Sequence, residues 1–400
     1  MAPTALRPSR PAARDAPELD IDLYADAAIE DSAPAFAQIR DAGPAVWMPG
    51  HRLWAIGRFN EVRDALRDDE LFASGHGVAA NPLTNLAARG TTLFSDGEPH
   101  VTRRRVLMRS LGAKALGPIA DRLDAEAEAI VAGLLGRGRF DAARDFSSGL
   151  PMRVVADLVG VRVSGERLLG WGSSSFDALG PLNRRGLRAA AGGLGMIAYS
   201  QRLSRSRVVP GSWAESVFEA AERGEISKRE ARSMVIDFVA PSLDTTILAS
   251  TQMLWLLGEN PAAWQRLRED PALIPAAVVE SVRLGSPIRG FTRRLGRDAE
   301  FGGVRMRAGE RAALLFGAAN LDERRYPDPE CFDLDRPPGG NLGWGFGPHT
   351  CVGIHLAKLE MAALLRALLA QVETIEIAGP PVRIRNNTLQ GIGSLPARLR

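Results

Sequence analysis

The feature that most constrains the fold is a glycine-rich loop that ends in Cys351 and leads directly into a helix. The loop reads Trp-Gly-Phe-Gly-Pro-His-Thr over residues 344–350, and helical spacing follows over residues 354–370. Glycines let a backbone approach a flat ligand closely, and the N-terminus of a helix stabilises a thiolate. We therefore expect a fold that encloses a planar cofactor beside Cys351.

Haem iron is the natural partner of such a thiolate, which pushes electron density towards iron-bound oxygen. The loop resembles the haem-ligand loop of cytochromes P450, in which Cys351 would be the iron ligand. The family's loop also has an aromatic residue, a glycine and a basic residue before the cysteine and a glycine after it, and these positions hold Trp344, Gly347, His349 and Gly353. Trp344 stands in place of the usual phenylalanine. The resemblance implies haem b as the cofactor and the P450 fold, which is mainly α with minor β sheets.

An isolated cysteine is more often a small buried hydrophobic residue than a ligand, so the loop is what favours iron ligation by Cys351. Cys331 lies in Pro-Glu-Cys-Phe, has no comparable setting and is expected to be structural. Two cysteines in 400 residues indicate neither a disulfide framework nor a CxxC metal site.

Length and composition indicate one large domain over residues 20–400, because a chain that is 45% hydrophobic can bury a large core. Residues 1–19 are rich in Pro, Ala and Arg and are expected to form a loose tail. The chain has no run of 18 apolar residues and no signal-peptide pattern, so we expect a cytoplasmic protein without membrane contact. The net charge of +3 is spread along the chain, which does not favour nucleic-acid binding.

Helical spacing dominates the chain. It covers residues 33–42, 59–68, 99–111, 118–135, 187–204, 228–255 and 353–372. Alternating stretches that predict strands are shorter and lie near both ends, at residues 45–56, 299–315 and 374–399. This pattern agrees with the fold that the resemblance implies.

A carboxylate and a guanidinium stand three residues apart at Glu280 and Arg283, where one helix face brings them together. Most such pairs are solvated surface bridges that contribute little. The pair resembles the ExxR motif of P450s, whose arginine and glutamate join a second arginine from a later loop. Arg336 resembles that third member, so the resemblance implies a buried network of the three side chains.

Haem propionates need cationic or N–H donors inside a protein. The segment that contains His100 and Arg104 resembles the family's start of the C helix, where these two positions reach a propionate, and their i, i+4 spacing suits this. Arg293 and His349 resemble the remaining propionate contacts. Arg103 and Arg105, which flank Arg104, are expected to form a solvated charged face.

The pair Asp244 and Thr245 resembles the acid–alcohol pair of the P450 I helix, which delivers protons to iron-bound O2. A threonine that bonds back to its own helix is the alternative, and it suits Thr246 better. Pro241 and Ser242 replace the family's usual Ala-Gly, and the proline should bend the helix. This departure leaves open altered oxygen activation or a preference for peroxide.

Several segments are similar to bacterial P450s that O-demethylate or hydroxylate para-substituted aromatic acids, namely residues 176–181, 377–380 and 386–396. By that similarity the walls above the haem would be formed by Val78, Phe176, Leu179, Ala240, Pro241, Phe291 and Ile392. Such apolar walls suit an aromatic ring.

The same relatives bind a carboxylate with arginine and serine, but this chain has His76 and Asp237 at two of those positions. An Asp237 that faces the pocket would repel a benzoate and favour a neutral or cationic substrate. Alternatively, its carboxylate points away and bonds within the protein. The sequence leaves both arrangements open.

The resemblance implies a monomeric monooxygenase that inserts one atom of O2 into a small aromatic substrate, by hydroxylation or O-demethylation. The chain contains no flavin or ferredoxin segment, so electrons from NAD(P)H would arrive through a separate ferredoxin and its reductase. A basic surface around Arg109 and Lys114 would suit an acidic ferredoxin. The rival hypotheses are a haem-thiolate sensing protein and a helical scaffold without haem.

Overall fold

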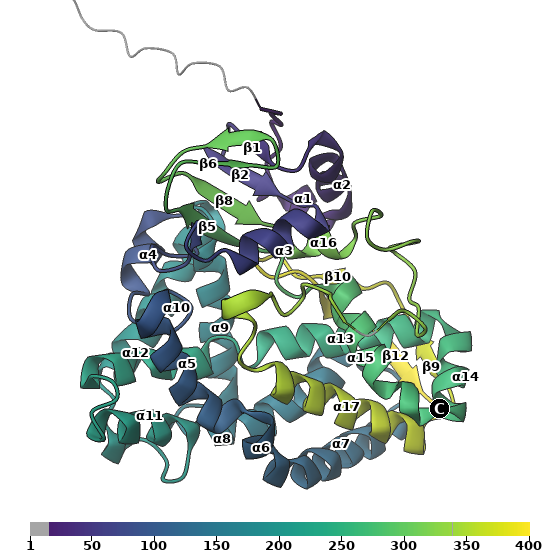
Figure 1. Cartoon of the computed structure of the whole chain (residues 1–400). Helices are drawn as coiled ribbons and strands as arrows, with labels where there is room; N and C mark the ends of the chain where they lie inside the picture. The colour runs from purple at the N-terminus through teal and green to yellow at the C-terminus, as the bar shows by residue number, and fades with distance from the viewer. Residues whose placement is uncertain (1–15, 338) are drawn as a thin grey trace, which may run out of the picture.

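Helices form most of the structure, a computed structural model that describes residues 16–337 and 339–400 (Figure 1). The helices are α1 (Asp26–Glu30), α2 (Ala33–Ala42), α3 (Phe59–Arg67), α4 (Pro82–Ala87), α5 (Gly97–Leu111), α6 (Ala113–Leu116), α7 (Ala120–Leu135), α8 (Ala156–Val159), α9 (Gly165–Leu179), α10 (Arg184–Gln201), α11 (Trp213–Glu222), α12 (Lys228–Val239), α13 (Asp244–Glu259), α14 (Pro261–Glu269), α15 (Ile274–Gly285), α16 (Phe316–Asn320) and α17 (Ile354–Gln371). Short 3-10 or π segments are η1 (Gly117–Ile119), η2 (Ala142–Ser147), η3 (Pro151–Val155), η4 (Arg205–Arg207), η5 (Pro271–Leu273) and η6 (Gly347–His349).

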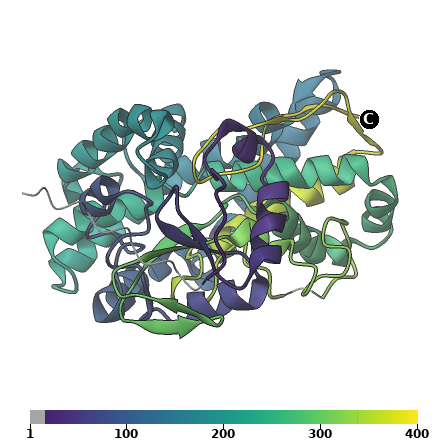
Figure 2. The same ribbon diagram turned by 90° about the horizontal axis from the view of Figure 1, so that it is seen from above.

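The strands gather into small sheets. They are β1 (Val46–Met48), β2 (Leu53–Ile56), β3 (Phe72–Ala73), β4 (Phe140–Asp141), β5 (Phe291–Leu295), β6 (Ala299–Phe301), β7 (Val304–Met306), β8 (Arg311–Leu314), β9 (Ile375–Ile377), β10 (Val382–Arg383), β11 (Ile392–Ser394) and β12 (Pro396–Leu399). The largest sheet has the order β1-β2-β8-β5-β3, with β2 parallel to β8 and the other pairs antiparallel. Viewed from above, this strand-rich part lies between the teal helices and the C-terminal segments (Figure 2).

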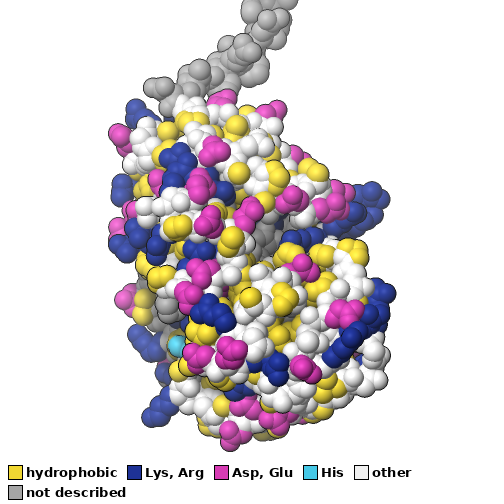
Figure 3. Space-filling model, turned by 90° about the vertical axis from the view of Figure 1, so that its right-hand side faces the viewer, with side chains coloured by type: hydrophobic (Ala, Val, Ile, Leu, Met, Phe, Trp, Pro, Cys, Tyr) yellow, Lys and Arg dark blue, Asp and Glu magenta, His cyan; other side chains and the backbone are white. Residues whose placement is uncertain are grey.

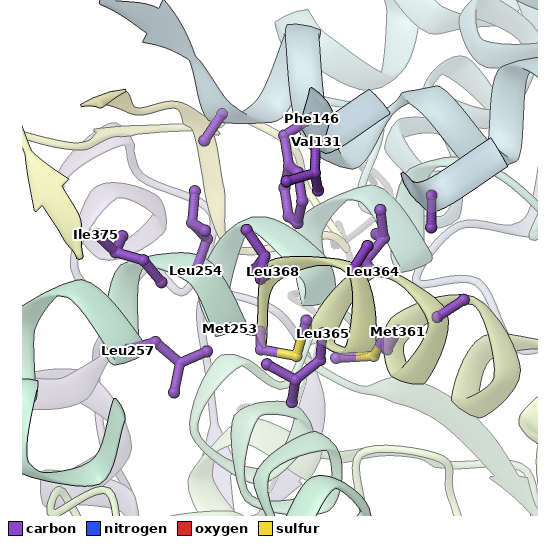
Figure 4. Close-up of a cluster of buried hydrophobic side chains, with 14 of the residues drawn as sticks. Val131, Phe146, Met253, Leu254, Leu257, Met361, Leu364, Leu365, Leu368 and Ile375 are labelled. Atoms are coloured by element: carbon purple, nitrogen blue, oxygen red, sulfur yellow. The ribbon is translucent and has the colours of Figure 1, made fainter. Parts of the chain in front are cut away.

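The hydrophobic core is centred on α13 and α17. Figure 4 shows Met253, Leu254 and Leu257 of α13 beside Met361 and leucines of α17. Helix α13 is buried on most of its surface, and its buried residues include polar ones such as Ser250, Thr251 and Gln252. The segments predicted to be helical overlap α2, α3, α5, α7, α10, α12, α13 and α17, although α5, α10 and α13 extend beyond the predicted bounds. The predicted segments did not include α9, α11 and α14.

The N-terminal boundary differs from the prediction of a tail that ends at residue 19. Residues 16–19 lie along β1: the N–H of Trp47 donates to the carbonyl of Pro17 at 2.8 Å, and the N–H of Leu19 donates to the carbonyl of Trp47 at 3.0 Å. Backbone pairing therefore orders these residues although their composition has no periodicity. Residues 1–15 lie outside the described residues.

The surface carries charges of both signs. On the face drawn in Figure 3, Lys and Arg side chains are interspersed with Asp and Glu. Within residues 16–337 and 339–400, no helix is long and apolar enough to cross a lipid bilayer.

Candidate functional site

A cavity of about 500 Å³ lies where the Cys351 loop faces α12, α13 and α5. Cys351 and Trp344 line it from the loop, and Thr245 and Thr246 line it from α13. Helices α9 and α10 and the segment around α4 supply further lining residues. The cavity therefore brings together segments from most of the chain around one thiol.

Glycines shape the loop. Gly345 and Gly347 have φ of +71° and +69°, a left-handed conformation that glycine adopts without strain. A Cβ on Gly347 would lie 2.6 Å from the carbonyl oxygen of Leu66, so no larger residue fits there. The N–H of Cys351 donates to the carbonyl of Trp344 at 2.8 Å, which closes the loop just before α17 begins at Ile354. The backbone is thus held close to the cavity.

The thiol of Cys351 is accessible from the cavity and otherwise surrounded by protein. Burial raises the pKa of this thiol, and a hydrogen bond from the N–H of Gly353 and the charge of Arg104 act in the opposite direction. Because burial disfavours a free thiolate here, the sulfur is best held as a thiolate when a metal cation replaces its proton. On the loop, the ring of Trp344 lies 5.0 Å from the ammonium of Lys358.

Four basic side chains line the cavity near the thiol. The rings of His100 and His349 lie against each other with their centroids 4.2 Å apart and their planes tilted by 39°, and His349 Nε2 lies 3.3 Å from Asp96 Oδ1. Burial lowers the pKa of His100 to about 4 and that of Arg293 to about 10. In the part of the chain that the structure describes, no carboxylate forms an ion pair with Arg104 or Arg293. Such buried cations require an anionic partner.

Asp96 is a site residue that sequence reasoning missed. It precedes α5, and its carboxylate accepts hydrogen bonds from the N–H groups of Ser74 (3.1 Å) and Gly75 (2.6 Å) as well as contacting His349. A Cβ on Gly75 would lie 2.8 Å from Asp96 Oδ2. Its place immediately before a helix start was the available signal, because aspartate is a preferred residue at helix N-termini.

The structure brings Glu280, Arg283 and Arg336 together. Arg283 donates to both carboxylate oxygens of Glu280, at 2.8 and 2.7 Å, and Arg336 Nε donates to Oε1 at 3.0 Å. Arg283 also donates to the carbonyl of Cys331 at 3.2 Å, and its guanidinium carbon lies 4.9 Å from the centre of the Tyr326 ring. The side chain of Cys331 is exposed, so its backbone carbonyl is what takes part in this network.

Asp244 and Thr245 point in different directions. Asp244 does not line the cavity; its Oδ2 is buried without a hydrogen-bond partner, and a Cβ on Gly172 of α9 would lie 2.3 Å from it. Burial raises the pKa of Asp244 to about 7. Thr245 does line the cavity, and its hydroxyl donates to the carbonyl of Pro241 at 3.0 Å. The back-bonding expected for Thr246 is therefore found at Thr245.

The predicted single bent helix is broken into two. Helix α12 ends at Val239 and α13 begins at Asp244, with Pro241 and Ser242 between them. Proline has no N–H to continue the helix, and the hydroxyl of Ser242 donates to the carbonyl of Phe238. The effect of proline is therefore larger than the bend we expected.

Comparisons with known proteins decide the family. The family profile described as Cytochrome P450 matches residues 214–397. Cytochrome p450 CYP199A2 of Rhodopseudomonas palustris is 34% identical over 389 residues, which cover 96% of this chain and 94% of the relative. The chain belongs to the cytochrome P450 family. This P450 is also 28% identical to linalool 8-monooxygenase of Pseudomonas putida, over 94% of this chain and 96% of the relative.

Solved structures confirm the predicted fold of this P450. The haem domain of CYP116B5 from Acinetobacter radioresistens superposes with a TM-score of 0.85 at 21% identity, over 95% of this chain and 97% of that one. Epothilone D-bound P450epoK superposes with a TM-score of 0.82 at 22% identity, over 96% and 99% of the two chains. Family membership makes the protein an oxidoreductase of the monooxygenase type with a haem-thiolate cofactor.

The residues of this P450 fit that cofactor. Glycines keep the loop backbone close to the cavity, the thiol is accessible from it, and Arg104 and Arg293 lack carboxylate partners among the described residues. Haem supplies both the iron for a thiolate and the propionates for unpaired cations. These properties come from the chain itself and are independent of the comparisons.

Most of the residues predicted for the substrate pocket line the cavity. They are Phe176, Leu179, Asp237, Ala240, Pro241 and Phe291. These residues come from α9, from the end of α12 and the break after it, and from β5. Because they are spread over separate segments, the pattern of apolar residues alone does not identify them as one pocket. Sequence reasoning missed Thr92 and the apolar residues of α10, including Leu187 and Leu194.

Three predicted pocket residues lie elsewhere and need correction. His76 is exposed, because a turn at Gly77 (φ +95°) directs it towards solvent. Val78 is buried beside β5, where its carbonyl accepts from the N–H of Thr292 at 3.0 Å, and it lines a small neighbouring pocket. Ile392 is fully buried in the core around α13. Each belongs to a segment near the cavity but faces another way.

Asp237 combines the two arrangements that the sequence left open. It lines the cavity, and its Oδ2 also accepts hydrogen bonds from the N–H and the hydroxyl of Thr92, at 2.9 and 2.7 Å. Burial raises the pKa of Asp237 to about 6, and the Thr92 bonds and the charge of Arg103 act in the opposite direction. Arg103 is not the solvated residue we expected, since two of its guanidinium nitrogens donate to Glu230 Oε1, at 3.2 and 2.8 Å.

The predicted basic docking surface is partly neutralised. Arg109 donates to both carboxylate oxygens of Glu225, at 2.9 and 2.6 Å. These bonds lower the pKa of Glu225 to about 2, so the carboxylate stays charged under ordinary conditions. Lys114 remains exposed on this side.

Proposed function

We propose that this P450 is a haem b monooxygenase that inserts one atom of O2 into a small aromatic molecule, by hydroxylation or O-demethylation. Electrons would come from NAD(P)H through a separate ferredoxin and its reductase, and the protein would act as a cytoplasmic monomer. The observation that carries the proposal is the position of Cys351 in the same cavity as the unpaired cations Arg104 and Arg293. Haem supplies the iron at which oxygen is activated.

In this proposal the chain's residues divide the work. Cys351 would ligate the iron, and Gly347 and Gly353 would keep the loop close to the haem, with Trp344 as the aromatic residue of that loop. The propionates would be bound by the adjacent rings of His100 and His349 together with Arg104 and Arg293. The Glu280, Arg283 and Arg336 network fixes the loops on the thiolate side.

Proton delivery is proposed to run through Asp244 and Thr245. A carboxyl with a pKa of about 7 can both give and take a proton near neutral pH, and the adjacent hydroxyl of Thr245 lines the cavity. Because Asp244 faces Gly172, its proton must reach the cavity through a rotation of its side chain or through water.

A peroxide-driven reaction is the second candidate. The observation in its favour is that Asp244 lies outside the cavity lining while Pro241 interrupts the helix beside it. Peroxide supplies the two electrons and two protons that O2 would need, so this reaction requires neither a redox partner nor protons delivered from solvent.

Turnover with methoxyaromatic compounds tests both candidates. The purified protein would be supplied either with NADH, a surrogate ferredoxin and its reductase, or with hydrogen peroxide alone. Demethylated product and formaldehyde in the first arm support the proposal, and product only in the second arm supports the peroxide reaction. Haem-containing protein that forms no product from any member of a chemically diverse panel in either arm would support a binding or sensing role.

A further inference from the structure

The charged side chains that line the cavity form two separate groups. His100, His349, Arg104 and Arg293 lie together near the thiol, where they perturb one another and Cys351. Asp237 belongs to a different part of the wall, at the end of α12, and its charged neighbour is Arg103, which does not line the cavity. Among the described residues, none of the cations that line the cavity acts on the pKa of Asp237, so the wall around this carboxylate offers no lining cation to an anionic substrate.

The two oxygens of Asp237 have different roles. Oδ2 accepts both hydrogen bonds from Thr92, which fixes the orientation of the carboxylate. Oδ1 accepts no hydrogen bond within the described residues, and it is not among their fully buried unpartnered atoms. Because Asp237 lines the cavity, Oδ1 is the oxygen that remains accessible to a bound molecule.

The surrounding wall is apolar. Ile236 and Ala240 flank Asp237 on its own segment, and Phe176, Leu179 and Phe291 face the same cavity. Leu187 and Leu194 of α10 also line it and are largely exposed at the surface, so the route inwards is apolar too. An oriented carboxylate acceptor among apolar side chains selects by hydrogen bonding, because any bound group that cannot pair with it leaves it unsatisfied.

We propose that the substrate is a predominantly apolar molecule with a hydroxyl or amine group that donates a hydrogen bond to Asp237 Oδ1, and that carboxylic acids are excluded. The inference rests on the proposed function, since it concerns the substrate of the same cavity. Thr92 is a positioning residue in this arrangement: it holds the acceptor towards the substrate but does not itself recognise it. A carboxylate at this position would meet a like charge, and the nearby cation Arg103 is already paired with Glu230 and does not line the cavity.

Three ligands with one aromatic body separate the possibilities: 4-methoxybenzylamine, 4-methoxybenzyl alcohol and 4-methoxybenzoate. Their dissociation constants would be measured by calorimetry at pH 7.5, on protein whose haem-thiolate spectrum has first been recorded. We expect the amine or the alcohol to bind at least tenfold more tightly than the benzoate, because hydrogen bonds to a charged acceptor are the stronger ones. The amine and alcohol arms distinguish a cationic from a neutral donor.

Variants then assign the preference to Asp237. In Asp237→Asn the like charge is removed, so the affinity for benzoate should rise at least tenfold while the affinity for the amine falls. In Thr92→Val the donor preference should fall, whereas Asp121→Asn, which removes an exposed carboxylate on α7, should leave all three constants unchanged. The inference would be overturned if benzoate bound as tightly as both donors, or if none of the three ligands bound the haem-containing protein. It would also be overturned if the Asp237→Asn variant kept the wild-type preference. A protein without a haem-thiolate spectrum would instead contradict the proposed function.

Discussion

Gly172 of α9 and Asp244 of α13 lie so close that a Cβ on the glycine would come within 2.3 Å of Asp244 Oδ2 and within 2.8 Å of the carbonyl oxygen of Ala240. The contact joins α9, which carries cavity residues, to the break between α12 and α13. Any added atom must push one of these segments away. The packing at this point therefore leaves no room for a side chain between α9 and the helix break, and it encloses the buried carboxyl.

Gly172→Ala should lower the thermal midpoint of unfolding by an amount that corresponds to roughly 1–3 kcal/mol, since overpacking forces backbone shifts. Gly170→Ala is the matched control on the same helix, because a Cβ there meets nothing within 4 Å. It should be neutral or stabilising by about 0.5–1 kcal/mol. Equal midpoints for the two alanine variants would show that the contact is looser than described.

The raised pKa of Asp244 predicts a pH-dependent effect on stability. Its pKa is about 7 in the folded protein against an ordinary value of 3.8, so the folded state takes up the proton first as the pH falls. Burial of the charged form destabilises the fold most above pH 7, and this cost disappears as the pH falls towards 4. Asp244→Asn should therefore be more stable than the wild type at pH 8, by roughly 1–4 kcal/mol.

Thermal melts of both proteins from pH 5 to pH 8 measure this difference. The gap between Asp244→Asn and the wild type should shrink steadily towards pH 5. A gap that stays constant over this range would mean that Asp244 does not titrate there.

Removing the Glu280 carboxylate should be severe. In Glu280→Ala both Arg283 and Arg336 lose their charged partner inside the protein, a change that typically costs about 3–5 kcal/mol. We expect little soluble, haem-containing protein, as measured by haem absorbance per mole of chain. Arg266→Ala, which breaks an exposed pair with Asp335, is the control and should retain normal haem content.

Thr245→Ala should lower the fraction of NADH that ends up in product, because the hydroxyl that lines the cavity would be lost. Thr245→Ser keeps the hydroxyl and should stay close to the wild type. The measurement is product formed per NADH consumed. Unchanged coupling in the alanine variant would remove Thr245 from proton delivery.

The sequence predicted local features well and long-range packing less well. The glycine-rich loop, the helical segments and the partners Glu280, Arg283 and Arg336 follow from residue types at fixed positions in motifs. By contrast, the burial of Ile392 and the exposure of His76 depend on how distant segments pack. Hydrophobic pattern alone does not contain that information.

Contacts that join distant segments were missed for the same reason. Asp237 and Thr92 are 145 residues apart, and Asp96 and His349 are 253 apart. The sequence marked Asp237 and His349 as candidate site residues, but it did not pair them with Thr92 or Asp96. In the helix that Pro241 interrupts, the missing N–H was predictable, but whether the chain bends or breaks depends on packing such as that of Gly172.

The central claim is that Cys351 is the thiolate ligand of a haem iron, and the absorption spectrum of the reduced protein with carbon monoxide tests it most directly. The wild type and Cys331→Ser should both show the strongly red-shifted Soret band of thiolate ligation. Cys351→Ser should lack that band, whether or not it retains haem. A haem-containing wild type without the band, or a Cys351→Ser variant that keeps it, would contradict the account.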